Sequence, residues 1–408
     1  MPPGSVVHLI TDPGPYPYPY FRLLIDGGLD PARLAIGSVS HAGALQDEMR
    51  AIGVRTFALG VRSRSQLPVA VARLAALLRR TAPAIVQTHL VEGCVIGLTA
   101  ARLAGVRAAI MTAHHSHELP FHGLKLALPE RVCAGPLSDV IVAPTRQVAD
   151  TLVRHAGARP EKIHVIHHGF DLSRFDPAVT DGVRVRAQLG IGAGETVIGA
   201  AGRLTPIKSF ATLIEAFARA IRDTGRSSTV DLGGRPDRAV EPAVRLLIAG
   251  AGDPAPLIVT ATEHGVRERL VLTGPRRDFP DVLAACDAFV HPARAESFGM
   301  VIVEAMAAGL PVLSTPVGIA TELLGDRGSG VRGAVPPAMG AFDAAPAGLL
   351  ASGPSVPELT AGLVTLLRAR DDWPAIGAAA RRAVEPFTGA RMATAYTDLY
   401  TRTLADAA

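Results

Sequence analysis

The sequence predicts an α/β protein built from two doubly wound parallel sheets. Short apolar runs rich in β-branched residues alternate with longer amphipathic segments along most of the 408 residues. This length exceeds what one hydrophobic core usually supports, so two or three domains are expected. With 48% apolar and 19% charged residues, the chain can bury sizeable cores and does not have the composition of a disordered protein.

The composition argues against several classes of protein. A net charge of only +4 and an aromatic content of 4% argue against a nucleic-acid partner. The cysteines Cys94, Cys133 and Cys286 form no C-x-x-C pair and are interpreted as reduced core residues of a cytoplasmic protein. No signal peptide and no bilayer-spanning apolar run is recognisable, so stable membrane insertion is not expected.

The first predicted strand, residues 6–10, leads into a loop of alternating proline and tyrosine over residues 13–20. Such a loop fits neither a helix nor a central strand, so it is expected to be stiff and extended. Stiff loops at strand ends either bind ligands or pack on their own domain, and the sequence leaves these two interpretations even. The candidate ligand-binding residues here are Asp12, Gly14, Tyr16 and Tyr18.

Strand and helix patterns then alternate through the rest of the first half, which implies a parallel sheet covered on both faces. The predicted strands are 34–39, 54–59, 84–88, 108–112, 139–143 and 163–167. The predicted helices are 43–52, 67–80, 92–104 and 145–155, the last with Thr145 as its N-cap.

A histidine-rich segment follows the strand 108–112. It contains His114, His115, His117 and His122 together with Glu118. A metal site is the weaker interpretation of this segment, because the spacing matches no zinc pattern and the segment is a loop.

The second half opens with a strand at 196–201 that ends in Gly202-Arg203-Leu204, and Lys208 is expected to start a helix running to about 222. Arg203 and Lys208 would face the same crevice at the strand's end. Phosphate recognition favours such a pair, because Arg supplies a donor fork and Lys a point charge.

Further strands are expected at 244–250 and 270–273, and helices at 359–369, 375–384 and 391–404. The turn Gly250-Ala251-Gly252-Asp253 lacks the third glycine of a dinucleotide fingerprint. A nicotinamide-dependent oxidoreductase is therefore disfavoured.

The segment from His291 to Pro311 organises the second half. A short buried strand is predicted just before it, at 288–290, so the local pattern is strand, loop and helix. Glu296 is predicted on the loop and Glu304 about one turn into the helix. The N–H groups of Gly299, Met300 and Val301 would begin that helix and could donate to phosphate oxygens. Two carboxylates flanking a helix N-terminus suit a ligand with hydroxyl groups at both ends and phosphate in the middle, such as a sugar nucleotide.

The string E-S-F-G-x-x-x-x-E-A-M-A-A-G, from Glu296 to Gly309, resembles the signature of retaining GT-B glycosyltransferases of family 4. The resemblance implies that Glu296 contacts hydroxyls of the transferred sugar and that Glu304 binds the ribose of the nucleotide. The segment Met111-Thr112-Ala113-His114 resembles the family's strand-end histidine beside the sugar, with His115 as the alternative register. Gly-Arg-x4-Lys resembles the family's diphosphate site, and the backbone at Arg276 would pair with the base.

The same resemblance implies two Rossmann-like domains facing a central cleft, with the C-terminal helix crossing back to the first domain. Residues 1–175 plus 386–408 would bind the acceptor, and residues 176–385 would bind the donor. Some family positions differ: Gly14 stands where a Gly-Gly turn is usual, Ser209 where Gly is common, and only Gly318 and Glu322 remain of a Gly-Gly-x-Pro-Glu loop.

The predicted function is retaining transfer of a hexosyl or N-acetylhexosaminyl group from a UDP- or GDP-sugar to a small acceptor. Cyclitols, saccharides and natural-product aglycones are the expected acceptors, and no metal or other cofactor is required. The catalytic candidates are Glu296, His114, Arg203 and Lys208. The donor-binding candidates are Arg203, Lys208, Arg276, Phe298, Gly299, Met300, Val301 and Glu304. The open alternatives are a lipid-linked acceptor, a sugar-nucleotide epimerase or hydrolase, and a non-catalytic binding protein, with homodimerisation also open.

Overall fold

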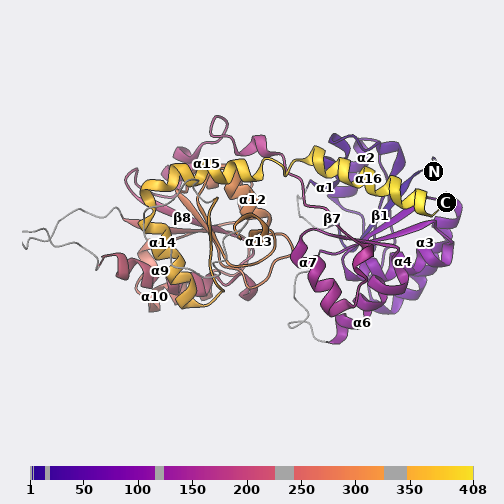
Figure 1. Cartoon of the computed structure of the whole chain (residues 1–408), viewed down its shortest axis with the longest axis horizontal. Helices are drawn as coiled ribbons and strands as arrows, with labels where there is room; N and C mark the ends of the chain where they lie inside the picture. The colour runs from indigo at the N-terminus through magenta and orange to yellow at the C-terminus, as the bar shows by residue number, and fades with distance from the viewer. Residues whose placement is uncertain are drawn as a thin grey trace, which may run out of the picture. The chain divides into compact units, whose positions relative to one another are not determined.

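The computed structural model of the chain describes residues 2, 4–13, 19–114, 124–225, 243–325 and 347–407. The chain divides into two compact units, which we call unit 1 (Met1–Asp171 and Phe387–Ala408) and unit 2 (Leu172–Pro386). Each unit has one sheet whose strand pairs are all parallel within the described residues (Figure 1). The predicted α/β architecture with two parallel sheets is therefore confirmed.

The sheet of unit 1 has seven strands in the described residues, in the order β3-β2-β1-β4-β5-β6-β7. Its strand order reverses beside β1, and ligands commonly bind at such a switch point, outside the carboxyl ends of the strands. The strands are β1 Val6–Ile10, β2 Leu34–Ser38, β3 Arg55–Ala58, β4 Ile85–His89, β5 Ala108–Thr112, β6 Val140–Ala143 and β7 Ile163–Val165.

Helices cover both faces of this sheet. One apolar cluster joins a face of the sheet to α3, α4 and α7, and a second joins the other face to α1, α2 and α16 (Figure 1). The helices are α1 Tyr20–Asp26, α2 Ala44–Ala51, α3 Leu67–Thr81, α4 Val91–Ala104, α6 Leu124–Val132, α7 Arg146–Thr151 and α16 Gly389–Asp406. Thr145 caps α7 as predicted, since its Oγ1 accepts the Val148 N–H at 3.3 Å.

The C-terminal helix α16 packs on α1 within unit 1. Gly27 and Gly389 permit this contact, because a Cβ on Gly27 would lie 2.4 Å from Ala393 Cβ, and one on Gly389 would lie 2.7 Å from Leu23. The segment that leads into α16 is held by Phe170, whose N–H donates to Phe387 O at 2.9 Å.

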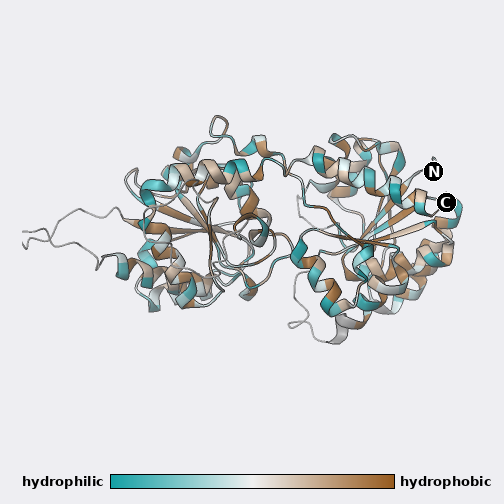
Figure 2. Cartoon of the chain, viewed as in Figure 1, coloured by the Kyte–Doolittle hydropathy of each residue, from teal (hydrophilic) through white to brown (hydrophobic). Residues whose placement is uncertain are grey.

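The sheet of unit 2 has six strands in the described residues, in the order β10-β9-β8-β11-β12-β13. Figure 2 shows hydrophobic residues concentrated in the central strands of both sheets, as expected for parallel sheets covered on both faces. The strands are β8 Thr196–Ala201, β9 Val244–Ala249, β10 Leu270–Gly274, β11 Ala288–His291, β12 Val312–Ser314 and β13 Leu349–Leu350.

In unit 2, α9 packs beside α10 and α14, while α12 packs against α15. The helices are α8 Gly182–Gln188, α9 Phe210–Gly225, α10 Ala255–Glu263, α11 Phe279–Ala284, α12 Met300–Ala307, α13 Ala320–Leu323, α14 Val356–Arg368 and α15 Trp373–Val384. None of the helices in the described residues is long and apolar enough to cross a membrane.

One predicted helix start is wrong. Lys208 does not begin α9; it ends a 3₁₀ turn, Pro206–Lys208, and α9 starts at Phe210. The residue between them, Ser209, has left-handed backbone angles (φ 53°, ψ 32°) and so interrupts the helix. Lys208 thereby stays on a loop at the carboxyl edge of the sheet.

Candidate functional site

The predicted strand, loop and helix around the two glutamates are present as β11, residues 292–299, and α12. Gly299 makes the turn into α12 with φ 85°, and a Cβ at this position would lie 2.8 Å from Ile302 Cδ1. Ser297 is not the N-cap of α12. Glu296 lies on the loop and Glu304 inside the helix, as expected.

Three hydrogen bonds hold the loop in place. The Arg294 N–H donates to Ile207 O at 2.8 Å, and Thr315 Oγ1 donates to Ala293 O at 2.6 Å. The Ile319 N–H donates to Phe298 O at 2.7 Å. Neighbouring connections of the same sheet edge therefore fix the position of Glu296.

Glu296 lies in a polar cluster at the carboxyl ends of β8 and β11. Lys208 Nζ donates a hydrogen bond to Glu296 Oε1, and His291 Nε2 lies 3.3 Å from the same oxygen. Lys208 and Glu296 are each 15% exposed, and the His291 side chain is 1% exposed. Burial alone would raise the pKa of Glu296, but His291 and Lys208 outweigh it and hold that pKa at about 2.

Arg203 lies two residues after the end of β8 and is exposed. It shares the connection between β8 and α9 with Lys208, so the predicted Arg–Lys pair lies at one sheet edge. The cluster therefore offers a fixed ammonium and a nearby solvent-exposed guanidinium, which is an arrangement suited to an anionic ligand.

The Gly250-Ala251-Gly252 turn has a packing explanation. A Cβ on Gly250 would lie 1.8 Å from Gly202 O, and a Cβ on Gly252 would lie 2.7 Å from Leu204 Cβ. The Leu204 N–H also donates to Ala251 O at 2.8 Å. These glycines let the connections after β8 and β9 touch, so they do not require a dinucleotide ligand.

Glu304 has a different environment from Glu296. Its side chain is partly exposed on α12, yet the protein atoms around its carboxyl desolvate it and raise its pKa to about 7. The positive charge of Arg174 acts in the opposite direction but does not cancel this effect. A carboxyl with a pKa of about 7 can ionise when a ligand binds, and it can then accept hydrogen bonds from the ligand's hydroxyl groups.

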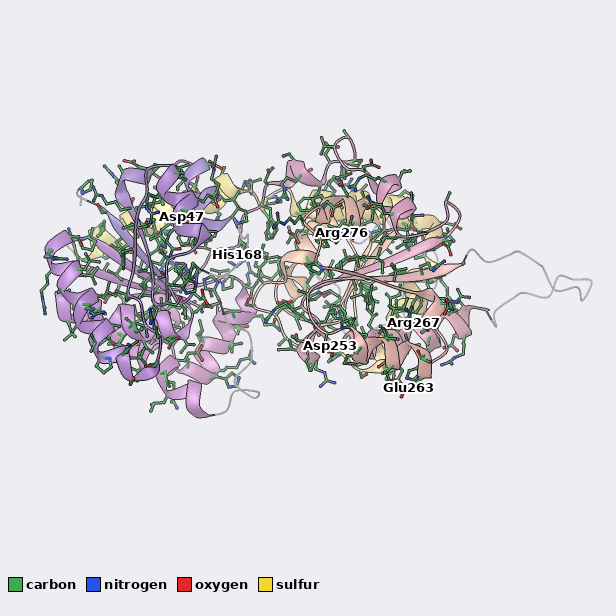
Figure 3. All side chains as sticks on the ribbon, turned by 180° about the vertical axis from the view of Figure 1, so that it is seen from behind. Asp47, His168, Asp253, Glu263, Arg267 and Arg276 are labelled. Atoms are coloured by element: carbon green, nitrogen blue, oxygen red, sulfur yellow. The ribbon has the colours of Figure 1, made fainter. Side chains whose placement is uncertain are left out.

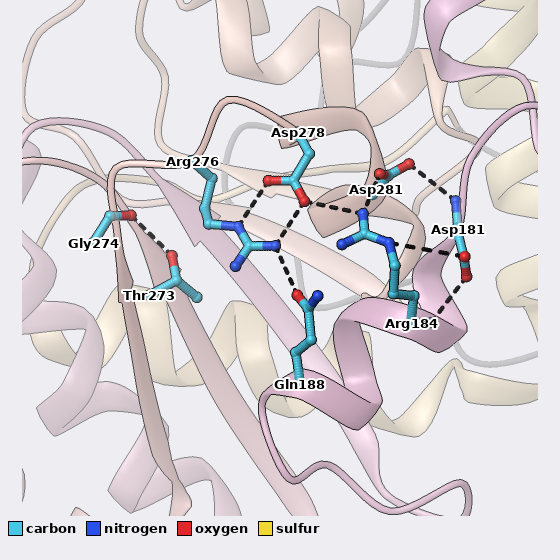
Figure 4. A network of polar contacts seen from close by, with 8 residues as sticks. All are labelled: Asp181, Arg184, Gln188, Thr273, Gly274, Arg276, Asp278 and Asp281. Carbon is cyan, nitrogen blue, oxygen red and sulfur yellow. Dashed lines mark hydrogen bonds and ion pairs between the residues drawn. The ribbon is translucent and has the colours of Figure 1, made fainter.

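The side chain of Arg276 belongs to an ion-pair network (Figure 4). Its Nε and Nη2 contact Asp278 at 2.8 and 2.7 Å, and Nη2 also donates to Gln188 Oε1 at 3.2 Å. Arg184 contacts Asp278 at 3.0 Å and Asp281 at 2.5 Å. The Arg276 hydrogen bond is the main reason that the pKa of Asp278 falls to about 2. This pairing engages the Arg276 side chain within the protein and holds the loop after β10.

The remaining donor candidates are at the same edge of unit 2. Met300 and Val301 form the first turn of α12 and are partly exposed. The Phe298 ring is only 1% exposed and lies in the core, so backbone atoms are its means of reaching a ligand. Arg276, labelled in Figure 3, follows β10.

In unit 1, His114 lies just after β5 and is partly buried. Its Nε2 is 2.9 Å from His89 Nδ1, and its ring stacks on that of His168 with centroids 5.9 Å apart. Asp12 is exposed after β1. Gly14, Tyr16, Tyr18 and the other members of the histidine-rich segment (His115, His117, His122 and Glu118) lie outside the described residues. Across the described part of the chain, no group of three or more His, Cys, Asp or Glu side chains could hold a metal ion.

The sequence reasoning missed His291, His89, His8 and His168 as candidate site residues. Each lies inside or directly after a predicted strand, and His8 interrupts the otherwise apolar run Val-Val-His-Leu-Ile. A polar residue within a strand that is buried on both faces was the available signal.

Comparisons with known families cover both units. Residues 33–174 match a model described as Glycosyltransferase Family 4, and residues 195–352 match a model described as Glycosyl transferases group 1. The two matched spans together make up well over half of the chain.

The alignments with curated relatives cover only part of the chain. A D-inositol 3-phosphate glycosyltransferase of Rhodococcus opacus (strain B4) is 37% identical over 184 residues, which are 44% of this chain and 39% of the relative. The protein of the same name from Mycobacterium sp. (strain KMS) is 34% identical over 228 residues, 54% of this chain and 46% of that protein. The chain thus spans less than half the length of these relatives.

Solved structures share the fold over nearly the whole chain. Anabaena HepE in complex with UDP and glucose has a TM-score of 0.75 at 23% identity, covering 98% of this chain and 99% of that one. Sucrose-phosphate synthase from Thermosynechococcus elongatus has a TM-score of 0.72 at 17% identity, covering 98% and 100%. The two matched family models show that the chain belongs to glycosyltransferase family 4, and the shared architecture shows that it has the GT-B fold.

Proposed function

We propose that this protein transfers a glycosyl group from a nucleoside-diphosphate sugar to a hydroxyl of a small acceptor, with retention of anomeric configuration. The observation that carries the proposal is the Lys208–Glu296 pair at the carboxyl edge of the unit 2 sheet, in a family 4 chain. A carboxylate held ionised next to an ammonium can serve a ligand with both hydroxyl and phosphate groups.

The donor's diphosphate is proposed to contact Lys208, Arg203 and the N-terminus of α12. As the bond to the sugar breaks, negative charge grows on the leaving diphosphate. Preorganised cations and helix N–H groups stabilise such charge without reorganising, which is an electrostatic form of catalysis. These groups can do this work without a metal, so we expect activity to survive a chelator.

Glu296 is proposed to accept hydrogen bonds from hydroxyls of the transferred sugar. Its pKa of about 2 keeps it ionised, and therefore a hydrogen-bond acceptor only, at every physiological pH. Glu304 would take the ribose hydroxyls, and the backbone near Arg276 would contact the base. In unit 1, His114 would contact the sugar. No side chain need act as a nucleophile, because a departing phosphate oxygen can accept the acceptor's proton.

The acceptor class favoured here is a cyclitol or its phosphate. The support is indirect: the curated relatives from Rhodococcus opacus and Mycobacterium are named D-inositol 3-phosphate glycosyltransferases. The donor is proposed to carry uridine diphosphate or guanosine diphosphate, and HepE, which shares the fold, was solved with UDP. Acceptor binding is assigned to unit 1, where Asp12 is the described candidate.

The test measures transfer and nucleotide binding separately. UDP- and GDP-linked hexoses and N-acetylhexosamines are supplied with inositol 3-phosphate, inositol or a simple saccharide, and the anomeric configuration of the product is read by proton NMR. We expect Glu296→Ala to lower the transfer rate by at least 100-fold while calorimetry shows that UDP or GDP still binds.

Glu195→Gln is the matched control. Glu195 also pairs with a cation, Arg245 at 2.8 Å, but it precedes β8 and so lies at the opposite edge of the same sheet. Its loss should leave transfer near the wild-type rate. Full activity in Glu296→Ala would refute the proposed role of this carboxylate, and a product with inverted configuration would refute retention.

A further inference from the structure

A row of hydrogen-bonded histidines crosses the interior of unit 1. His8 Nδ1 is 3.0 Å from His89 Nε2, and His89 Nδ1 is 2.9 Å from His114 Nε2. The rings overlap along the row, with centroid separations of 5.3 Å and 5.2 Å. The three residues come from β1, the end of β4, and the loop after β5, so adjacent parallel strands build the row.

The inner end of the row meets the C-terminal helix. Tyr400 of α16 places its Oη 3.4 Å from His8 Nε2 and donates to Gln87 Oε1 at 2.5 Å. The Gln87 Nε2 is directed at Tyr20 Oη, 3.4 Å away, and at Thr112 Oγ1, so the carbonyl side of the amide faces Tyr400. The Gln87 Nε2 correspondingly donates to Thr112 Oγ1 at 2.7 Å.

The contact between Tyr400 and His8 determines which atom donates in every hydrogen bond of the row. Since Tyr400 gives its only hydroxyl proton to Gln87, its oxygen can only accept from His8 Nε2–H. A neutral imidazole has one N–H, so His8 Nδ1 must accept a proton from His89 Nε2–H. By the same argument His89 Nδ1 accepts from His114 Nε2–H, so the neutral form of His114 carries its proton on Nε2.

The row is shielded from solvent by its surroundings. His8 is fully buried, His89 is 4% exposed and Gln87 is fully buried. The rings of Tyr20 and Phe21 meet His8 and His89 edge-on, with Phe21 at 5.1 Å and 6.0 Å. Burial lowers the pKa of His8 to about 3, and burial together with the neighbouring histidines lowers the pKa of His89 well below its usual value. Both rings are therefore neutral at pH 7.

We propose that His8 and His89 are positioning residues that hold His114 as its Nε2–H tautomer, and that Tyr400 sets the direction of the row. In this neutral tautomer Nδ1 of His114 is a hydrogen-bond acceptor, and an acceptor suits a sugar hydroxyl that donates. The link to the sugar rests on the proposed function, whereas the tautomer assignment does not.

The tautomer is tested by NMR on the full chain labelled with [¹⁵N]histidine, because protonated and unprotonated ring nitrogens have well-separated shifts. The signals of His114 are identified by their loss in His114→Gln. We expect one set of signals at pH 7, with Nε2 protonated and Nδ1 unprotonated. A proton on His114 Nδ1 would overturn the proposal, and this result requires no variant of the row to fold.

Tyr400→Phe tests whether the Tyr400 hydroxyl sets the direction of the hydrogen bonds in the row. It removes the hydroxyl but keeps the ring, so both directions of the row become accessible and His114 should show two tautomers. If these are equally populated, kcat should fall about twofold while the KM for the donor nucleotide is unchanged, since half of the molecules are competent.

Thr403→Val is the control on the same helix. Thr403 is buried about one turn from Tyr400 on α16, and its hydroxyl donates to Leu399 O at 2.8 Å rather than to the row. We expect it to retain a single His114 tautomer and the wild-type kcat. The same mixture in both variants, or one tautomer in both, would overturn the role of Tyr400. A fully active His114→Gln would overturn the link to the sugar, whichever tautomer is observed.

Discussion

Lys208 Nζ donates a hydrogen bond to Oε1 of Glu296, which lies 88 positions further along the chain. The two residues follow β8 and β11, which are neighbours in the unit 2 sheet. The pairing makes the two groups interdependent, because a ligand that takes the ammonium must leave the carboxylate with His291 or with a new donor. We expect a sugar nucleotide to bind the Lys208 ammonium and to supply a new hydrogen-bond donor to Glu296 at the same time.

The first prediction concerns the stability of this pair. Lys208→Met leaves an ionised, largely buried Glu296 with only His291, so we expect it to destabilise unit 2 by about 2 kcal/mol at pH 7. Trp373 is the single tryptophan of the chain and is buried in unit 2, so its fluorescence during urea unfolding reports on this unit.

The pH dependence of that loss provides a check. The pKa of Glu296 is about 2 in the folded protein, below its usual value, so the pair stabilises the fold fully above the ordinary carboxyl pKa. The difference between wild type and Lys208→Met should be constant from pH 5 to 8 and shrink from pH 4.5 towards pH 2. In the double variant with Glu296→Gln, the loss should be smaller than in Lys208→Met. Additive losses would show that the two side chains do not interact.

The second prediction concerns Glu304, whose folded pKa of about 7 lies above its unfolded value. Between roughly pH 4.5 and 7 the folded state binds more protons than the unfolded state, so the stability of unit 2 falls as the pH rises. Glu304→Gln removes this penalty. It should equal wild type at pH 4 and exceed it by roughly 1 to 3 kcal/mol at pH 8, measured by Trp373 fluorescence.

Folding favours the protonated form of the Glu304 carboxyl, whereas nucleotide binding should favour its ionised form. If Glu304 accepts ribose hydroxyls as a carboxylate, binding of a UDP-sugar, whose esterified diphosphate has no group that titrates near pH 6, should release a proton at pH 6, detectable by calorimetry in buffers of different ionisation enthalpy. Glu304→Gln should abolish this release. A stability difference from wild type that does not vary with pH would mean that the carboxyl is not desolvated as described.

The sequence predicted the fold and the local structure around Glu296 and Glu304 better than the row of histidines in unit 1, for physical reasons. Glu296, Gly299 and Glu304 belong to one short strand-loop-helix unit, so local patterns placed them correctly. The His8–His89–His114 row depends on pairing between strands far apart in the chain, and no local period reveals such pairing. The Lys208 error arose because a helical pattern does not show a left-handed residue at Ser209.

The third prediction concerns Ser209, which combines two unfavourable features. Its backbone is left-handed, and its buried Oγ has no hydrogen-bond partner among the described residues. Ser209→Gly should relieve both and stabilise unit 2 by about 1 kcal/mol, once the greater flexibility of glycine in the unfolded chain is subtracted.

Ser209→Ala separates the two features, since it removes the hydroxyl but keeps the backbone strain. We expect its stability, from the urea midpoint of Trp373 fluorescence, to lie between those of wild type and Ser209→Gly. If alanine proves as stabilising as glycine, the left-handed backbone at this position carries no measurable strain.

The fourth prediction concerns the contact between the connections after β8 and β9. A Cβ on Gly250 would lie 1.8 Å from the carbonyl oxygen of Gly202, and this obstacle is backbone that cannot rotate away. Gly250→Ala should therefore destabilise unit 2 by about 3 kcal/mol or more and weaken nucleotide binding, because it displaces the loop that carries Arg203. Gly194→Ala is the control, since a Cβ there meets nothing within 4 Å on an exposed loop of the same unit. Equal stability of the two variants by Trp373 fluorescence would show that this close approach does not hold the two loops together.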